Sequence, residues 1–245
     1  MSGRATHPRG GSAWPAGTLV SALDETARAE LFALGHAQPY RPGAVLIQQG
    51  DPRRDHVLLL RSARPGTPAC AKVTAALGNG AEALLGVRVS GDLVGEMAVL
   101  RGTDRSATVT ACTPTLAFRI AAADFTAYLD RHPRLWSALA AMIADRLDWA
   151  NRRRLDFAAF PVPVRLARVL DELATRHGLP VEEGTDIGVR LSQPELGRLI
   201  GAKEAAVNNA VRLLKKNGLL LIRWKRLVVT DPEGLRAFGS EMWSP

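Results

Sequence analysis

The most informative segment of this sequence runs from Val94 to Val109 and reads VGEMAVLRGTDRSATV. A glycine followed by a glutamate opens a segment whose backbone amides can point at an anion. Nine residues after Glu96, Arg105 can neutralise a phosphate and Ser106 can donate its hydroxyl, while Glu96 can accept from a sugar hydroxyl. The pattern suits a small molecule that carries both ribose and phosphate. Taken alone, these residues leave a buried Glu–Arg ion pair open as the alternative.

Short apolar runs separated by turn signals surround this segment between residues 40 and 120. Clusters of Gly, Pro, Asp and Asn punctuate the runs, which predicts a compact β sandwich or roll. Upstream, residues 19–34 have apolar side chains at helical spacing, which predicts a short amphipathic helix. The Gly-, Pro- and Ser-rich residues 1–17 are expected to be a disordered tail and not a signal peptide. The expected strands include residues 45–47, 57–60, 84–87, 108–110 and 116–118.

An apolar stripe marks a long helix after the β region. Leu135, Leu139, Met142, Arg146 and Trp149 recur at spacings of four, three, four and three. This a/d-like pattern predicts a helix with one face that packs on a partner. The residues leave two partners open, namely the same helix of a second subunit and the chain's own β domain.

Phe-Pro-Val-Pro at residues 160–163 interrupts the helical pattern, because proline disfavours helix in the residue before it. An amphipathic helix is expected directly afterwards. The chain is therefore expected to divide into a tail (1–17), a β domain (18–130), a long helix with a hinge (131–160) and a C-terminal domain (161–245).

Two short helices joined by a glycine turn are predicted in the C-terminal domain. Residues 192–195, Ser-Gln-Pro-Glu, form a capping box, in which serine and glutamate satisfy each other's backbone amides. The first helix is expected to end at Gly201 and the second to cover residues 203–217, while the small Gly197 lets the two axes approach. Two helices in this arrangement form a helix-turn-helix.

A basic hairpin is expected to follow the second helix. β-rich runs at 219–222 and 227–229 flank residues 223–226, Arg-Trp-Lys-Arg, so the domain is predicted to be a winged helix. In such a domain the second helix enters the major groove, and its N-terminal side chains meet base edges. Arg212, further along that helix, is expected to hold phosphate. The expected DNA contacts are Ser192, Gln193, Lys203, Glu204, Ala205, Asn208, Asn209, Arg212 and Lys225.

Basic residues gather in this same part of the chain. The sequence has 32 Lys and Arg against 24 Asp and Glu, a formal charge of +8. Residues 190–226 alone hold nine basic and two acidic side chains, a local charge of +7. Phosphate binding needs such clustering. The distribution of charge therefore predicts that the DNA-binding surface lies within residues 190–226.

Several classes of function are disfavoured by the composition. Cys70 and Cys112 are too few for an all-cysteine zinc site or an iron–sulfur cluster, and they are expected to be small buried apolar residues in a reducing cytoplasm. The sequence has no run of 18 apolar residues, so no membrane-spanning helix is expected. The five histidines are scattered and do not form the metal cluster that a cyclic-nucleotide hydrolase would need. We therefore expect a cytoplasmic, non-enzymatic protein without a metal or a membrane partner.

Residues 20–229 resemble the Crp/Fnr family of bacterial transcription regulators, and residues 95–108 resemble the phosphate-binding cassette of cyclic-nucleotide domains. The resemblance implies an α+β fold with an N-terminal cyclic-nucleotide-binding β-roll (jelly-roll-like), a long dimerisation helix and a C-terminal winged helix-turn-helix. In the family, the glutamate binds the ribose 2′-hydroxyl, and the arginine and the next hydroxyl residue bind the cyclic phosphate. The expected ligand contacts are Gly95, Glu96, Met97, Arg105, Ser106 and Ala107 of this segment, together with Arg146 and Asn151 of the long helix.

The resemblance also implies a homodimer that pairs through the helix around Leu135–Trp149, with Arg146 pairing with Glu96 and coupling the pocket to the interface. It implies cAMP as allosteric effector and double-stranded DNA as partner, and RNA polymerase is a further candidate partner. Family members commonly have a Thr-Ser pair that contacts adenine where this chain has Ala150 and Asn151. Of these two side chains only that of Asn151 can hydrogen-bond a base, so cAMP, cGMP and no effector all stay open.

Overall fold

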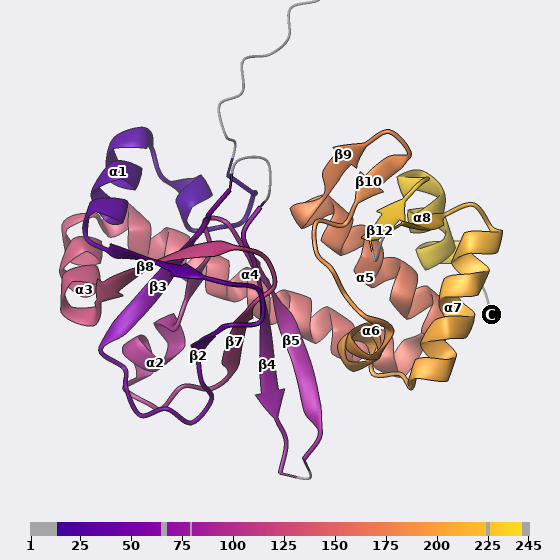
Figure 1. Cartoon of the computed structure of the whole chain (residues 1–245), viewed down its shortest axis with the longest axis horizontal. Helices are drawn as coiled ribbons and strands as arrows, with labels where there is room; N and C mark the ends of the chain where they lie inside the picture. The colour runs from indigo at the N-terminus through magenta and orange to yellow at the C-terminus, as the bar shows by residue number, and fades with distance from the viewer. Residues whose placement is uncertain (1–13, 65–67, 79, 224–225, 242–245) are drawn as a thin grey trace, which may run out of the picture.

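Two four-stranded antiparallel sheets form a β-roll in the N-terminal part of the chain (Figure 1). The computed structural model describes residues 14–64, 68–78, 80–223 and 226–241. One sheet has the strand order β1-β8-β3-β6 and the other β2-β7-β4-β5, and side chains from both sheets share one apolar core. The strands are β1 (His36–Tyr40), β2 (Val45–Ile47), β3 (His56–Ser62), β4 (Cys70–Ala76), β5 (Glu82–Val89), β6 (Leu93–Val94), β7 (Thr108–Ala111) and β8 (Thr115–Ala121).

The predicted β-roll is confirmed, but sequence reasoning missed two of its longer strands. Strand β1 contains Pro39, which cannot donate to a ladder; the proline is tolerated because β1 lies at a sheet edge. Strand β4 reads CAKVTAA, and alanine has low β-propensity. It is held because it pairs with β5 on one side and β7 on the other. In both strands, tertiary pairing outweighs local propensity.

The end of the expected N-terminal tail belongs to the fold. Trp14 stacks on Phe32, with ring centroids 5.6 Å apart. The tail prediction is therefore too long at its C-terminal end, because an aromatic contact holds residues 14–17 against the roll. The rest of the predicted tail, residues 1–13, lies outside the described residues.

The single helix expected over residues 19–34 is wrong in its first third. A 3₁₀ turn, η1 (Val20–Ala22), comes first, and α1 (Glu25–Ala33) starts separately. The side chain of Asp24 accepts from the Ala27 amide at 2.8 Å and so begins a new helix, which a continuous helix would not permit.

Helix α4 (Pro133–Ala159) follows α3 (Ala122–Arg131) and runs from the roll to the C-terminal domain (Figure 1). The predicted stripe on α4 packs inward: Leu135, Leu139 and Met142 are at most 6% exposed and join the core of their own β domain. The prediction that this stripe forms the seam of a dimer is wrong, because its side chains are already buried within the subunit.

A helix-turn-helix with a β-hairpin wing forms the C-terminal domain, as predicted. After α4, helix α5 (Val162–His177) begins, and α6 (Gln193–Ile200) starts at the capping box of Ser192 and Glu195. Gly201, with φ 64°, ends α6 in the left-handed conformation. The remaining elements are β9 (Leu179–Val181), β10 (Gly184–Asp186), α7 (Glu204–Lys216), β11 (Leu220–Arg223), β12 (Arg226–Val229) and α8 (Pro232–Glu241).

One apolar core joins the β4–β5 hairpin to the C-terminal domain. It contains Leu84 and Val87 of β5, Leu199 of α6 and Trp149 of α4. The indole of Trp149 lies against Gly86, where a Cβ atom would meet the ring at 2.9 Å. The β-roll and the winged helix therefore pack against each other through one common apolar core.

Polar contacts surround this shared core. Lys72 of β4 pairs with Glu195 of α6, and Arg198 of α6 pairs with Glu82 of β5 at 2.5 Å. Arg153 of α4 donates to backbone carbonyls of β5 and α6 at 2.8–3.4 Å, and its guanidinium lies 3.8 Å from the Trp149 ring centroid. These contacts hold α6 against the hairpin.

We expect Gly197→Ala to destabilise the protein. A Cβ atom at Gly197 would lie 2.5 Å from the carbonyl oxygen of Ala202, which belongs to the backbone of the turn. The overlap outweighs the gain in helix propensity, so we expect a net loss of about 1–2 kcal/mol. Urea unfolding followed by circular dichroism measures it. Gly78→Ala is the control, because Gly78 is exposed with nothing within 4 Å. Equal stabilities of the two variants would contradict the close approach.

Candidate functional site

A cavity of about 380 Å³ lies between residues 95–108, named the cassette here, and strands and helices that include β5 and α4. The short helix α2 (Glu96–Arg101) begins directly after β6 and places Glu96 at the cavity, only 5% exposed. Asn151, in contrast, does not line the cavity within the subunit. The other predicted ligand contacts are brought together there: Gly95, Glu96, Met97, Arg105, Ser106, Ala107 and Arg146.

Gly95 is needed at the start of α2 for two separate reasons. Its φ of 85° is in the left-handed region, which glycine adopts without steric cost. A Cβ atom there would also lie 2.6 Å from Nη1 of Arg105 and 3.0 Å from Cδ1 of Ile47. The bare backbone lets the Arg105 guanidinium lie against it, and Nη1 donates to the Gly95 carbonyl at 2.7 Å.

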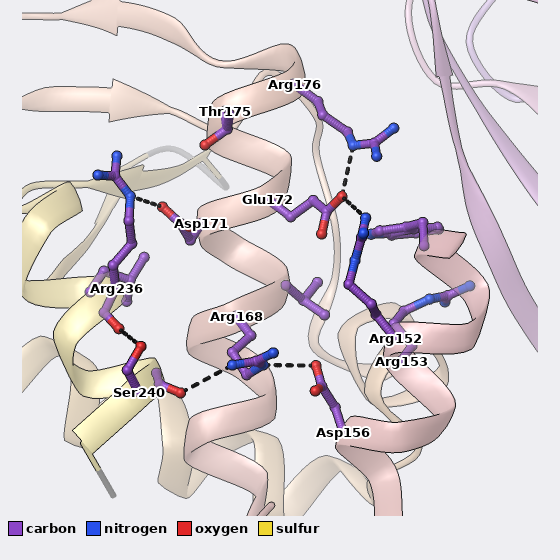
Figure 2. Close-up of a pocket in the computed structure, with 14 residues that line it drawn as sticks. Arg152, Arg153, Asp156, Arg168, Asp171, Glu172, Thr175, Arg176, Arg236 and Ser240 are labelled. Carbon is purple, nitrogen blue, oxygen red and sulfur yellow. Dashed lines mark hydrogen bonds and ion pairs between the residues drawn. The ribbon is translucent and has the colours of Figure 1, made fainter. Parts of the chain in front are cut away.

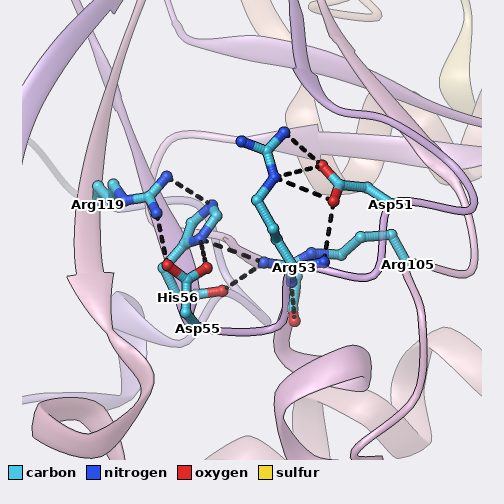
Figure 3. A network of polar contacts seen from close by, with 7 residues as sticks. Asp51, Arg53, Asp55, His56, Arg105 and Arg119 are labelled. Carbon is cyan, nitrogen blue, oxygen red and sulfur yellow. Dashed lines mark hydrogen bonds and ion pairs between the residues drawn. The ribbon is translucent and has the colours of Figure 1, made fainter.

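Figure 3 shows the network behind Arg105. Its Nη2 donates to the backbone carbonyl of His56 at 2.8 Å. The His56 ring has Nδ1 at 2.7 Å from Oδ1 of Asp55 and Nε2 at 3.2 Å from Nη1 of Arg119. Nδ1 therefore donates to the carboxylate, and Nε2 accepts from the guanidinium. Burial lowers the pKa of His56 against the opposing effect of the hydrogen bond that its ring donates to Asp55. The backbone carbonyl of His56 is what holds the Arg105 guanidinium.

Arg146 connects the cavity to α4. Its Nη1 donates to Oε1 of Glu96 at 2.8 Å, and its Nη2 donates to Oδ1 of Asp92 and to the carbonyl of Leu93, both at 2.9 Å. Both carboxylates are buried. The expected contact between Arg146 and Glu96 is thus present, and it includes a second carboxylate that sequence reasoning missed.

Arg88 is the charged residue at the cavity that sequence reasoning missed. It lies on β5 and lines the cavity. Burial, and then the neighbouring Arg146, lower the pKa of Arg88 to about 10. Among the described residues neither Arg88 nor Arg105 forms an ion pair, so two cations face the cavity without a bonded carboxylate. An arginine inside an apolar strand was the signal available in the sequence.

Helix α7 has one buried face and one exposed face. Its inward side chains, among them Val207 and Leu214, are almost fully buried. The outward face of α7 and its N-cap gathers six of the predicted DNA contacts, which lie on one side of the helix. Five of these are exposed and Asn208 is half-buried: Lys203, Glu204, Ala205, Asn208, Asn209 and Arg212. Arg212 donates to Oδ1 of Asn209.

The other three predicted DNA contacts are placed differently. Ser192 and Gln193 begin α6, whose Glu195 is held by Lys72 of β4, so this end of the helix lies against the β4–β5 hairpin. Lys225 lies outside the described residues. Apart from the exposed Ser192, the exposed candidates among the described residues therefore lie on α7 and its N-cap.

A second cavity, about 490 Å³, lies between α4, α5 and α8 (Figure 2). Asp156 of α4 accepts from Arg168 of α5 at 3.0 Å, and Glu172 of α5 accepts from Arg152 of α4 at 3.1 Å. Both ion pairs connect the end of α4 to α5, across the non-helical residues that separate the two helices. We interpret this cavity as part of the joint between α4 and α5.

A β-roll that encloses a cationic cavity and is joined by a long helix to a winged helix-turn-helix defines a ligand-binding transcription regulator. Comparison with known families agrees: residues 37–132 match the cyclic nucleotide-binding domain, and residues 164–238 match the Crp-like helix-turn-helix domain. The chain belongs to the Crp/Fnr family of DNA-binding transcription regulators. Within the described residues, every helix is too short or too polar to cross a membrane.

Similar proteins include curated transcription regulators and a solved structure. The CRP-like cAMP-activated global transcriptional regulator of Mycobacterium tuberculosis is 28% identical over 159 residues, 64% of this chain and 70% of that protein. The HTH-type transcriptional regulator Cmr of the same organism is 25% identical over 230 residues, 94% and 83% of the two chains. The solved structure of the c-di-GMP responsive regulator CLP of Xanthomonas campestris has a TM-score of 0.69 at 23% identity, over 85% of this chain and all of that one. The last likeness shows the shared fold.

We expect Arg146→Ala to be strongly destabilising. The substitution leaves the carboxylates of Glu96 and Asp92 buried without their shared cation, which costs about 3–5 kcal/mol. Guanidinium-induced unfolding measures the loss. Arg134→Ala, an exposed arginine on the same helix, is the matched control and should change stability by less than about 0.5 kcal/mol. If both variants unfold at the wild-type midpoint, the ion pairs of Arg146 with Glu96 and Asp92 do not stabilise the fold.

Proposed function

We propose that this protein is a homodimeric, sequence-specific DNA-binding regulator controlled by a cyclic nucleotide, with cAMP as the first candidate. The observation that carries the proposal is the cavity, where the guanidiniums of Arg88 and Arg105 lie without ion-pair partners among the described residues, beside the buried Glu96. A phosphate can neutralise these cations, and a sugar hydroxyl can donate to the carboxylate. The description of the M. tuberculosis relative as cAMP-activated supports cAMP. We propose the cytoplasm as its location and no catalytic role.

Ligand binding competes with the contacts that Arg105 makes in the structure. Its guanidinium donates to the neutral carbonyls of Gly95 and His56. A phosphate oxygen is a stronger acceptor than a carbonyl, so Arg105 turns toward the phosphate and Ser106 donates its hydroxyl. Glu96 keeps Oε1 on Arg146, while Oε2 accepts from the ribose.

The same carboxylate links the ligand to the long helix. Arg146 is shared between Glu96 and Asp92, so a ligand bound at Glu96 changes the electrostatic field that holds α4. Helix α4 ends at Ala159, and two non-helical residues separate it from α5, which begins at Val162. Reorientation at this break sets two recognition helices about 34 Å apart, one turn of DNA.

The dimer seam proposed here uses the outer face of α4. Trp136, Ala140, Ile143, Leu147 and Ala150 follow one another at spacings of four, three, four and three. None of them is fully buried, and Leu147 is 59% exposed. This heptad-like strip lies beside the buried stripe and fits a parallel pair of α4 helices. Asn151 is exposed next to the strip, where it can reach a ligand held by the partner subunit.

A regulator of the same fold that responds to cGMP or another ligand, or to none, is the second candidate. The observation that favours it is on α4, where Ala150 offers no hydrogen bond to a base and Asn151 lies outside the cavity of its own subunit. DNA affinity with and without nucleotide separates the candidates. Equal affinity in both conditions supports the second.

We expect Arg105→Ala to abolish cyclic-nucleotide binding. Two charge-assisted hydrogen bonds to phosphate are lost, which weakens binding by about 100-fold or more. Isothermal titration with cAMP and cGMP side by side measures it, and Arg101→Ala, at the exposed end of α2, should bind like the wild type. Fluorescence anisotropy on duplexes selected from a random pool reports DNA binding. A wild type that releases no heat with either nucleotide at high micromolar concentration rejects the effector proposal.

We expect Leu147→Glu to convert the dimer into a monomer. The substitution places two carboxylates in an apolar seam and should raise the dimer dissociation constant by about 100-fold or more. Sedimentation equilibrium measures the mass. Leu155→Glu is the control, because Leu155 is 68% exposed but lies about one quarter turn away from the strip. If the two variants dimerise equally well, the strip that contains Leu147 is not the dimer interface.

A further inference from the structure

The two cysteines of the chain stand opposite each other on neighbouring strands. Strands β4 and β7 are antiparallel with Ala71 opposite Ala111, so Cys70 faces Cys112 one step further along. The Cys112 amide donates to the Cys70 carbonyl at 2.7 Å, and the Cys112 thiol donates to the Thr110 carbonyl at 3.7 Å. Opposed residues in such a pair have Cα atoms about 4.5–5.5 Å apart, which lies within the range of about 4.4–6.8 Å that a disulfide spans.

The two thiols differ in access and in charge. Cys70 is fully buried, whereas Cys112 is partly exposed and lines a surface cavity of about 370 Å³ together with Lys72 and Glu195. The neighbouring Cys70 thiol, together with the Lys72 ammonium, lowers the pKa of Cys112 against burial and Glu195. The Cys112 thiol, and then burial, raise the pKa of Cys70. Because the thiolate is the nucleophile and Cys112 is the more accessible thiol, Cys112 is the one expected to react first.

We propose that Cys70 and Cys112 form a reversible intramolecular disulfide when the protein meets a hydroperoxide. The Cys112 thiolate attacks a peroxide oxygen, the O–O bond breaks, and the second oxygen leaves with a proton as an alcohol, or as water from hydrogen peroxide. The resulting sulfenic acid is then attacked by the Cys70 sulfur. The S–S bond forms, the S–O bond breaks, and hydroxide leaves as water with the Cys70 proton. Two thiols are oxidised and one peroxide is reduced.

The position of this pair is separate from the nucleotide cavity. Cys70 belongs to the apolar core shared by the β4–β5 hairpin and the C-terminal domain, and Lys72 two residues further on holds Glu195 of α6. A bond here would join β4 to β7 next to the seat of α6. Transient disulfides that sense oxidants are the usual kind in a reducing cytoplasm, and this proposal does not depend on which nucleotide the cassette binds.

Mass spectrometry of the full chain tests the proposal. The reduced protein is treated with hydrogen peroxide, quenched, denatured and alkylated with iodoacetamide. We expect both thiols to become resistant to alkylation, the mass to fall by about 2 Da, and dithiothreitol to restore both. Digestion should yield a peptide that links Cys70 to Cys112. Treated protein that still has two alkylatable thiols, or that has sulfinic acid without a cross-link, overturns the proposal.

Single variants test the order of reaction. Cys70→Ala should accumulate a sulfenic acid at Cys112 that dimedone traps, because the second thiol is missing. Cys112→Ala should leave Cys70 reduced, since that thiol is buried. The double variant corrects for oxidation of the 4 methionines. Circular dichroism checks that each variant is folded. A dimedone adduct on Cys70, or none on Cys112, contradicts the assignment of the attacking thiol.

Discussion

The ion pairs of the half-buried Arg146 guanidinium with two buried carboxylates are the constraint on which the arrangement of this chain depends. A buried charge is tolerated only when it is paired and hydrogen-bonded, and Arg146 satisfies both Glu96 and Asp92 at 2.8 and 2.9 Å. One of these carboxylates belongs to the cassette, and the arginine belongs to α4. The ligand cavity and the long helix therefore share one ion-pair network, so neither can shift without disturbing the other.

Strand β5 contributes to both the ligand cavity and the core shared with the winged helix, and it contains a β-bulge. Gly86 pairs with Val73 and Leu84 pairs with Thr74, so Leu85 is the extra residue between them. Such a residue re-aims the side chains that follow it. Because successive side chains of a strand point to opposite faces, Leu84 packs in the core shared with the winged helix while Leu85 lines the ligand cavity. The residue that lines the cavity is thus the direct neighbour of a residue that packs in the core with α6. This gives allosteric coupling between the cavity and α6 a short physical route.

Patterns with a local cause were predictable from the sequence, and features set by tertiary contacts were not. The capping box at Ser192, the glycine at 197 and the cassette around Glu96 each depend on neighbours in the chain, and the structure has them where the spacing indicated. The residues of the α4 stripe left two partners open, and the resemblance favoured the one that the structure does not show for this face. Periodicity shows that one face is buried but not what buries it, and Leu139 joins the subunit's own core. Arg88 was missed because its role appears only when β5 meets α4.

Charge counted along the chain overstates the DNA-binding surface. The segment 190–226 has a formal charge of +7. Three of its arginines are paired with carboxylates outside the segment: Arg198 with Glu82, Arg223 with Glu183 and Arg226 with Asp186. Their fields are partly cancelled before a phosphate arrives. The exposed cations on α7 and its N-cap, Lys203, Arg212, Lys215 and Lys216, have no such ion pairs with described residues. Within the described residues, attraction to the DNA backbone therefore depends mainly on the recognition helix.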